Sequence, residues 1–225
     1  MDFIRIIRSL EELLYEVMTW LVFYPRTMWR IVATPGRMMR YSDAEQADAS
    51  DKQYTDTLSP PLFLMLTILI GHGIGLGLGT QKPEATTAMA KTLFESEQNK
   101  LIAGSLLFSL FALMGATTAV ARRGLTLDRT TLRGPFYSQC YLTAPFALAQ
   151  SVASMLATLP ARGTGLAAAA VVLAGVVWYL CVETMWFGLE LDLGGGRAFL
   201  VAAWAFLKAV FVSVACLLLL TALLG

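Results

Sequence analysis

Five long apolar runs, each bounded by charged residues or by glycine and proline, constrain the fold of this 225-residue chain more than any motif does. Each run is close to the roughly 20 residues that an α-helix needs to cross a hydrocarbon core. Backbone groups left unpaired in lipid are too costly, so the runs must be helical. The sequence therefore predicts an all-α, polytopic membrane protein with five transmembrane helices, over residues 62–80, 101–121, 136–159, 166–189 and 198–224.

The composition fits one membrane domain and little else. Because 56% of the residues are hydrophobic and only 15% are charged, few remain to build a separate water-soluble core. We expect a five-helix domain over residues 58–225, preceded by a cytoplasmic arm and polar linker over residues 1–57. A net charge of +1 gives no general attraction to nucleic acid. The three cysteines, which lie in apolar runs without CxxC spacing, predict packing residues and no metal or cofactor: Cys140, Cys181 and Cys216.

The distribution of basic residues predicts the orientation of the chain. Twelve of the 17 Lys and Arg residues lie in the arm and in the second and fourth loops, whereas four lie on the other side of the predicted spans. Cytoplasmic segments carry the excess of positive charge. We therefore expect a multi-pass membrane protein with a cytoplasmic N-terminus and an external C-terminus. The loop over residues 81–100 would lie outside and be helical over residues 85–97.

The first 24 residues have the pattern of an amphipathic helix. Apolar residues recur at alternating steps of four and three, from Phe3 through Ile7, Leu10, Leu14 and Val17 to Leu21, and charged residues occupy the opposite side. The segment is too charged to span a bilayer, so we expect it flat on the cytoplasmic surface or against a partner helix. Tyr24 and Pro25 are predicted to end it.

A second short amphipathic piece follows, interrupted at Pro35 and Gly36, and then a solvated linker over residues 41–57. The arginines of the amphipathic piece either attract anionic headgroups, by about 1 kcal/mol each, or only set the topology. These residues form the predicted lipid or partner surface: Arg26, Arg30, Arg37 and Arg40.

Two further groups of residues stand out within the spans. The first span ends in alternating glycines, which predict close helix packing or local unwinding: Gly71, Gly73, Gly75, Gly77 and Gly79. The third span, opened by Gly134 and Pro135 and kinked at Pro145, has a polar cytoplasmic end that predicts interhelical hydrogen bonds or a ligand vestibule: Tyr137, Ser138, Gln139, Tyr141 and Thr143.

Charged residues inside the bilayer are the most specific local signal. A charge at a helix centre costs roughly 3 kcal/mol even on insertion scales, so it must face a partner or water. Spans four and five form a hairpin, and this predicts an ion pair between Glu183 and Lys208, with His72 completing a polar centre. Two interpretations stay open: the pair fixes the register of the hairpin, or it lines a path for an ion or proton.

The order of these parts resembles the Yip family of five-span membrane proteins, in particular its bacterial branch. The resemblance rests on the amphipathic arm, Trp29 and Pro35, the pair Pro60 and Pro61 before the first span, and short tracts in the third and fourth spans: Tyr137-Ser138 with Pro145 and Pro160, and Trp178-Tyr179 followed by Arg197-Ala198. It implies a non-enzymatic protein that organises membrane or partner proteins.

No catalytic residues follow from the spacing, since no metal site or hydrolase triad can be recognised. The sequence therefore favours a non-enzymatic accessory or scaffold protein that binds membrane lipids and other membrane proteins, as part of a larger complex. The alternative is a permease or channel component with a polar path for an ion, proton or lipid headgroup. A membrane enzyme assembled from Glu183, His72 and the Tyr137 group comes third.

Overall fold

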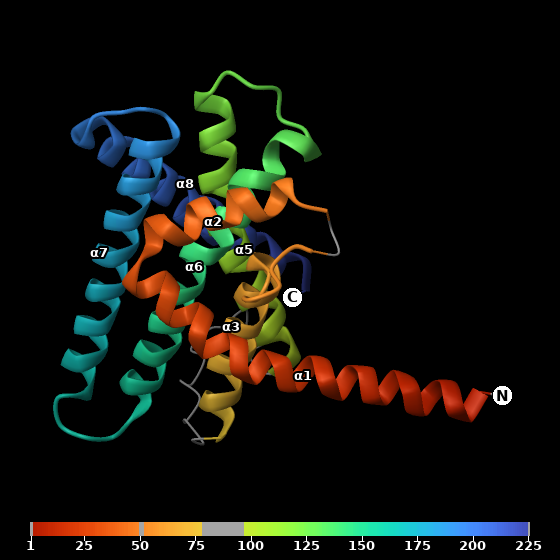
Figure 1. Ribbon diagram of the computed structural model, residues 1–225. Helices are drawn as coiled ribbons and strands as arrows, with labels where there is room; N and C mark the ends of the chain where they lie inside the picture. Colours follow the sequence, from red (N-terminus) through yellow and green to blue (C-terminus); the bar gives the residue numbers. More distant parts are fainter. Residues whose placement is uncertain (1, 50–51, 78–96, 225) are drawn as a thin grey trace.

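All the regular secondary structure in the described part of the chain is helical. The computed structural model describes residues 2–49, 52–77 and 97–224. Its helices are α1 (Asp2–Ala33), α2 (Pro35–Ala47), α3 (Pro60–Gly77), α5 (Glu97–Arg122), α6 (Arg129–Thr158), α7 (Thr164–Glu190) and α8 (Gly195–Leu224) (Figure 1). Five of these, α3 and α5 to α8, are long and apolar enough to cross a membrane, which confirms the predicted number of spans. The chain is an integral membrane protein.

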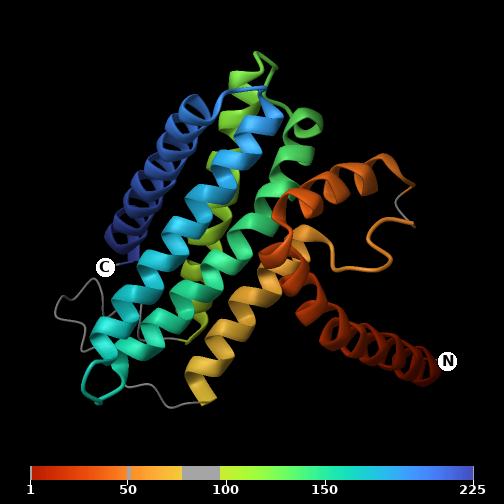
Figure 2. The same cartoon turned by 60° about the vertical axis from the view of Figure 1, so that its left-hand side comes forward.

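Helix α6 is the centre of the bundle. It packs against α3, α5 and α7, while α8 closes the other side against α5 and α7. The helices alternate in direction, so the α5–α6 turn and the α7–α8 turn lie at one end of the bundle, next to α2 (Figures 1 and 2). We call this the α2 end. The α6–α7 turn lies at the opposite end.

Helix α6 begins earlier than the predicted start at residue 134. The Asp128 carboxylate accepts hydrogen bonds from the backbone N–H groups of Thr130 and Thr131, at 2.8 and 2.9 Å, and the Thr131 hydroxyl accepts one from the backbone N–H of Asp128. This capping box satisfies N–H groups that would otherwise lack partners, and it fixes the start of the helix at residue 129. The helix continues through Pro135 and Pro145.

Helix α1 also continues beyond its predicted end. The prediction that Tyr24 and Pro25 stop the helix is wrong, because α1 runs through Pro25 to Ala33. A proline inside a helix removes one backbone hydrogen bond. Here Tyr24, Thr27 and Ile31, on both sides of the proline, pack against the rest of the molecule, and their burial compensates for that loss. Thr34 then separates α1 from α2, which begins at Pro35.

The segment over residues 41–57 is not the solvated linker that its polar composition predicts. Its first residues belong to α2, and Tyr54, Thr57 and Leu58 are buried. Tyr54 and Leu58 share one core cluster with residues of α1, α2, α3, α5 and α6. The predicted arm and the predicted membrane domain therefore meet in a common core.

Two predictions lie partly or wholly outside the described residues. The first span is described up to Gly77, so Gly79 cannot be placed, and the helix expected over residues 85–97 falls in the segment before α5. The other described spans agree with the prediction to within a few residues, apart from the start of α6.

Candidate functional site

The most unusual group in the bundle is the carboxyl of Glu183. It lies on α7, its side chain is 1% exposed, and its Oε2 accepts a hydrogen bond of 3.1 Å from Nε2 of Gln139 on α6. Gln139 is fully buried as well. Neither Oε1 of Glu183, nor Oε1 of Gln139, nor the hydroxyl of Thr143 has a hydrogen-bond partner among the described residues. Buried polar atoms are almost always paired, so three unpaired oxygen atoms in one place need an explanation.

We call this site the Glu183 cluster, and it consists of Glu183, Gln139, Thr143 and Tyr179. Tyr179 and the nearby Gly115 complete its shape. Tyr179 lies one turn before Glu183 on α7, and its phenol lies near both Glu183 and Thr143. Gly115 of α5 lies against the amide of Gln139, and a Cβ at this position would overlap the amide unless the amide moved. Gly115 and Tyr179 are not predicted as site residues from the sequence, because nothing in their local pattern places either residue beside Glu183.

An aromatic layer closes the cluster on the side away from the α2 end. It consists of one ring from each of four helices, with centroids 5.0 to 6.3 Å apart: Phe111 of α5, Phe146 of α6, Tyr179 of α7 and Phe206 of α8. Rings at these distances pack favourably and leave little room for water. The cluster is therefore sealed toward the opposite end of the bundle.

The predicted ion pair between Glu183 and Lys208 does not form. Nζ of Lys208 donates a hydrogen bond of 2.7 Å to the hydroxyl of Thr118 on α5. The predicted hairpin of α7 and α8 is present, and α8 packs on both α5 and α7. Lys208, however, is rotated toward α5, and its flexible side chain finds a polar partner there.

His72 does not complete a polar centre with these two residues. It lies on α3, which packs against α6 and α5, and the described contacts of Glu183 and Lys208 involve other residues. Gly71, the neighbour of His72, lies against Ser151, twelve residues along α6 from Gln139, so His72 also lies at a different depth from Glu183.

The predicted glycine surface divides into two kinds of position. A Cβ at Gly71 would lie 2.5 Å from the Ser151 hydroxyl oxygen, so α3 and α6 approach closely there. Gly73 and Gly77 have no described residue within 4 Å of a Cβ. Of these three glycines, Gly71 serves packing within this chain, and no described residue covers the backbone at the other two.

The polar end of the third span is also divided, because its residues face different sides of α6. Tyr141 donates a hydrogen bond of 2.6 Å to the carbonyl of Leu58, and Gln139 faces Glu183. Tyr137 packs near Tyr54, with the Arg133 guanidinium 5.4 Å from the centre of its ring. These side chains make interhelical and helix–linker contacts rather than lining one vestibule.

Two of the four predicted surface arginines are engaged in the fold. Arg30 donates a hydrogen bond of 2.8 Å to Asp56, and Arg26 lies 3.8 Å from the same carboxylate. The Tyr41 hydroxyl donates to the other carboxylate oxygen at 2.6 Å. Burial works against ionisation, but these hydrogen bonds and the two positive charges lower the pKa of Asp56. Arg37 and Arg40 stay exposed.

A second charged group lies at the α2 end, close to the Glu183 cluster. Glu190 at the end of α7 pairs with Arg123 at 2.5 Å, and Asp43 of α2 accepts a hydrogen bond of 3.3 Å from Ser138 of α6. Burial raises the pKa of Asp43, while Ser138 and Arg123 oppose the shift. Because Ser138 is the neighbour of Gln139, the surface acid Asp43 and the buried acid Glu183 contact adjacent residues of α6.

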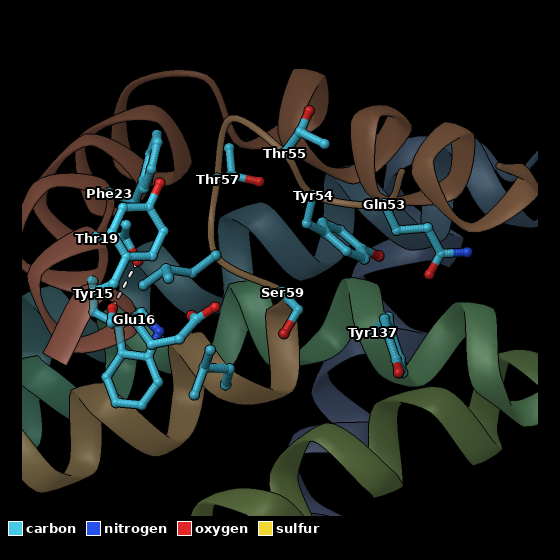
Figure 3. Close-up of a pocket in the computed structure, with 13 residues that line it drawn as sticks. Tyr15, Glu16, Thr19, Phe23, Gln53, Tyr54, Thr55, Thr57, Ser59 and Tyr137 are labelled. Atoms are coloured by element: carbon cyan, nitrogen blue, oxygen red, sulfur yellow. Dashed lines mark hydrogen bonds between the residues drawn. The ribbon is translucent and has the colours of Figure 1, made fainter. Parts of the chain in front are cut away.

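A groove of about 470 Å³ lies between α1, the segment before α3, and α6 (Figure 3). Tyr15, Thr19 and Phe23 line it from α1, and Tyr54, Thr57 and Tyr137 line it from the other two elements. It has one carboxylate, Glu16, and aromatic walls. This lining suits a binding surface, and it includes no paired acid and base that would indicate catalysis.

Among the described residues, no three His, Cys, Asp or Glu side chains are close enough together to hold a metal ion. Cys140 is buried, as predicted, but Cys181 is exposed on the outside of α7. Comparison with protein-family models, with curated proteins and with solved structures finds no match to this chain. The resemblance to the Yip family therefore stays a prediction from the sequence.

Proposed function

We propose that this integral membrane protein is a non-enzymatic accessory or scaffold protein of the bacterial inner membrane. Its α2 end would face the cytoplasm and its C-terminus the outside, because the α2 end carries most of the basic residues. Its partners would be membrane lipids and other membrane proteins, as in the Yip-like proteins that the sequence resembles.

One observation carries this proposal. The N-terminal turns of α1 extend away from the bundle, as Figures 1 and 2 show, and their apolar side chains are 51% to 66% exposed at Ile7, Leu10, Leu14 and Leu21. A monomeric soluble protein rarely leaves such a surface uncovered. At the edge of a bilayer, the same residues would be buried among headgroups and acyl chains, with the charged face toward water.

The binding of α1 to the lipid surface can be tested by measuring the membrane depth of two positions on opposite sides of this helix. In a variant without the native cysteines, a spin label at Leu14→Cys should collide with oxygen, which dissolves in lipid, more than with a water-soluble nickel complex. The matched control Glu12→Cys, half a turn away, should show the reverse preference. Equal exposure of both labels to the nickel complex would contradict binding to the lipid surface.

The scaffold role can be tested on α3. Leucine at Gly73 or Gly77 leaves this chain's own packing unchanged but would obstruct a second helix on the open backbone. We expect purification in mild detergent to give a larger assembly of fixed stoichiometry, which Gly73→Leu reduces to the single chain. A solitary species that conducts ions in liposomes would contradict the scaffold role and support a permease component, the alternative that the buried Glu183 favours.

A further inference from the structure

Glu183 is buried in the membrane domain, and no described residue supplies a compensating charge. Its described surroundings are neutral: Gln139 and Thr143 of α6, Tyr179 of α7, and Gly115 of α5 beside the amide of Gln139. The charged groups of the adjacent elements are turned toward other partners. Lys208 of α8 binds Thr118, Arg123 pairs with Glu190, and Asp43 of α2 binds Ser138.

A carboxylate ion in such a place is strongly disfavoured, and the group takes up a proton instead. The pattern of unpaired atoms agrees with this. Oε1 of Glu183 accepts no hydrogen bond from the described residues, and the hydroxyl of Thr143 is unpaired among them as well. A proton on Oε1 turns this oxygen into a donor, for which the neighbouring hydroxyl oxygens are acceptors.

The two ends of the bundle differ in their access to Glu183. Toward the opposite end, the layer of Phe111, Phe146, Tyr179 and Phe206 blocks water. Toward the α2 end, Glu190 lies seven residues farther along α7, about 10 Å away. Asp43 accepts a hydrogen bond from Ser138, the neighbour of Gln139, so an acid at the surface and the buried acid contact successive residues of α6.

We propose that Glu183 is a reversible proton-binding site in the bundle, loaded and unloaded from the α2 end. The ligand is the proton itself, and Gln139 is the positioning residue that orients the carboxyl. This proposal does not depend on the scaffold role, since it concerns the interior of the bundle and not the arm or the open face of α3.

The test uses the full-length protein in lipid nanodiscs, with two independent readouts. The first is modification by dicyclohexylcarbodiimide, which reacts with neutral carboxyl groups in apolar surroundings, mapped to the residue by mass spectrometry. The second is the infrared C=O band of a neutral carboxylic acid. We expect both to be strong near pH 5 and to fall as the pH rises to about 9, about tenfold for each unit above the midpoint. Glu183→Gln should abolish both, and Glu190→Gln should leave both in place.

Several results would overturn the assignment. No modification of Glu183 and no neutral-acid band at any pH would show that the group is ionised. Signals that do not change with pH would make Glu183 a permanent hydrogen-bond donor and not a reversible site. Protection from modification by Na⁺ or K⁺ at constant pH would assign the site to a metal cation instead. Because residue mapping on the unchanged protein identifies the modified group, the test does not rely on the folding of a variant.

The entry of protons to Glu183 from the α2 end is tested separately. After a rapid pH change, Asp43→Asn should slow the change in the infrared band several-fold, whereas Asp192→Asn should not. Asp192 is an exposed acid in the α7–α8 turn at the same end, and its positive φ of 50° is a conformation that asparagine also adopts readily. Equal rates in the two variants would overturn entry past Asp43.

Discussion

Gly115 of α5 is in direct contact with the side-chain amide of Gln139 on α6: a Cβ at residue 115 would lie 2.5 Å from the amide carbon. The amide cannot turn aside freely, because it is buried and bonded to Glu183. The absence of a side chain on α5 is therefore what allows α6 and α7 to share a hydrogen bond inside the bundle.

Gly115→Ala should destabilise the protein, by about 1–3 kcal/mol, because the added methyl group displaces Gln139 from Glu183. The matched control is Gly104→Ala on the same helix, where a Cβ would make ordinary contact with Ile68 at 3.7 Å. The control should be neutral or stabilising by up to about 1 kcal/mol, since alanine favours a helix. Unfolding by denaturant in micelles measures both, and equal losses would contradict the contact.

Double-mutant cycles can distinguish Thr118, the partner of Lys208 in the structure, from Glu183, the partner that the sequence predicts. Lys208→Met and Thr118→Val should be coupled by about 1 kcal/mol, because they remove the same hydrogen bond. Lys208→Met and Glu183→Gln should be additive, since their side chains have different partners. Coupling in the second cycle and none in the first would restore the ion pair that the sequence predicts.

The contacts of Asp56 should make the packing of the 52–59 segment depend on pH. Its pKa is lower in the folded protein than in the unfolded chain, so its contribution is complete above the unfolded value and is lost as the pH falls through the folded one. Amide hydrogen exchange near Thr57 and Leu58 should therefore accelerate, after correction for intrinsic rates, in acid below about pH 4. Asp56→Asn should exchange faster at neutral pH and show little of this acid dependence.

The glycines of α3 should differ in what they tolerate. Gly71→Val should lower the thermal stability in micelles, because its side chain would overlap Ser151 of α6 and separate the two helices. Gly73→Val, two residues away, meets open space and should cost no more than the modest loss expected for a β-branched residue in a helix. Equal losses at both positions would contradict the close approach of α3 and α6 at residue 71.

Much of the architecture follows from the sequence, but the candidate site does not. The five spans and the helical arm are local properties, since the cost of a polar backbone in lipid and the period of apolar residues are both set by neighbours along the chain. The errors at Pro25 and in the 41–57 segment have one cause: burial against distant residues such as Phe63 and Tyr141 outweighs the local signal.

The sequence by itself determined that Glu183 and Lys208 are costly inside a membrane and must have partners. Only the tertiary structure decided that those partners are Gln139 and Thr118, on two different helices. The physical reason is that side-chain pairing depends on how each helix is rotated and which helices lie beside it. Those choices follow from the packing of the whole bundle, for example the contact of Gly115 with Gln139, and no single span encodes them.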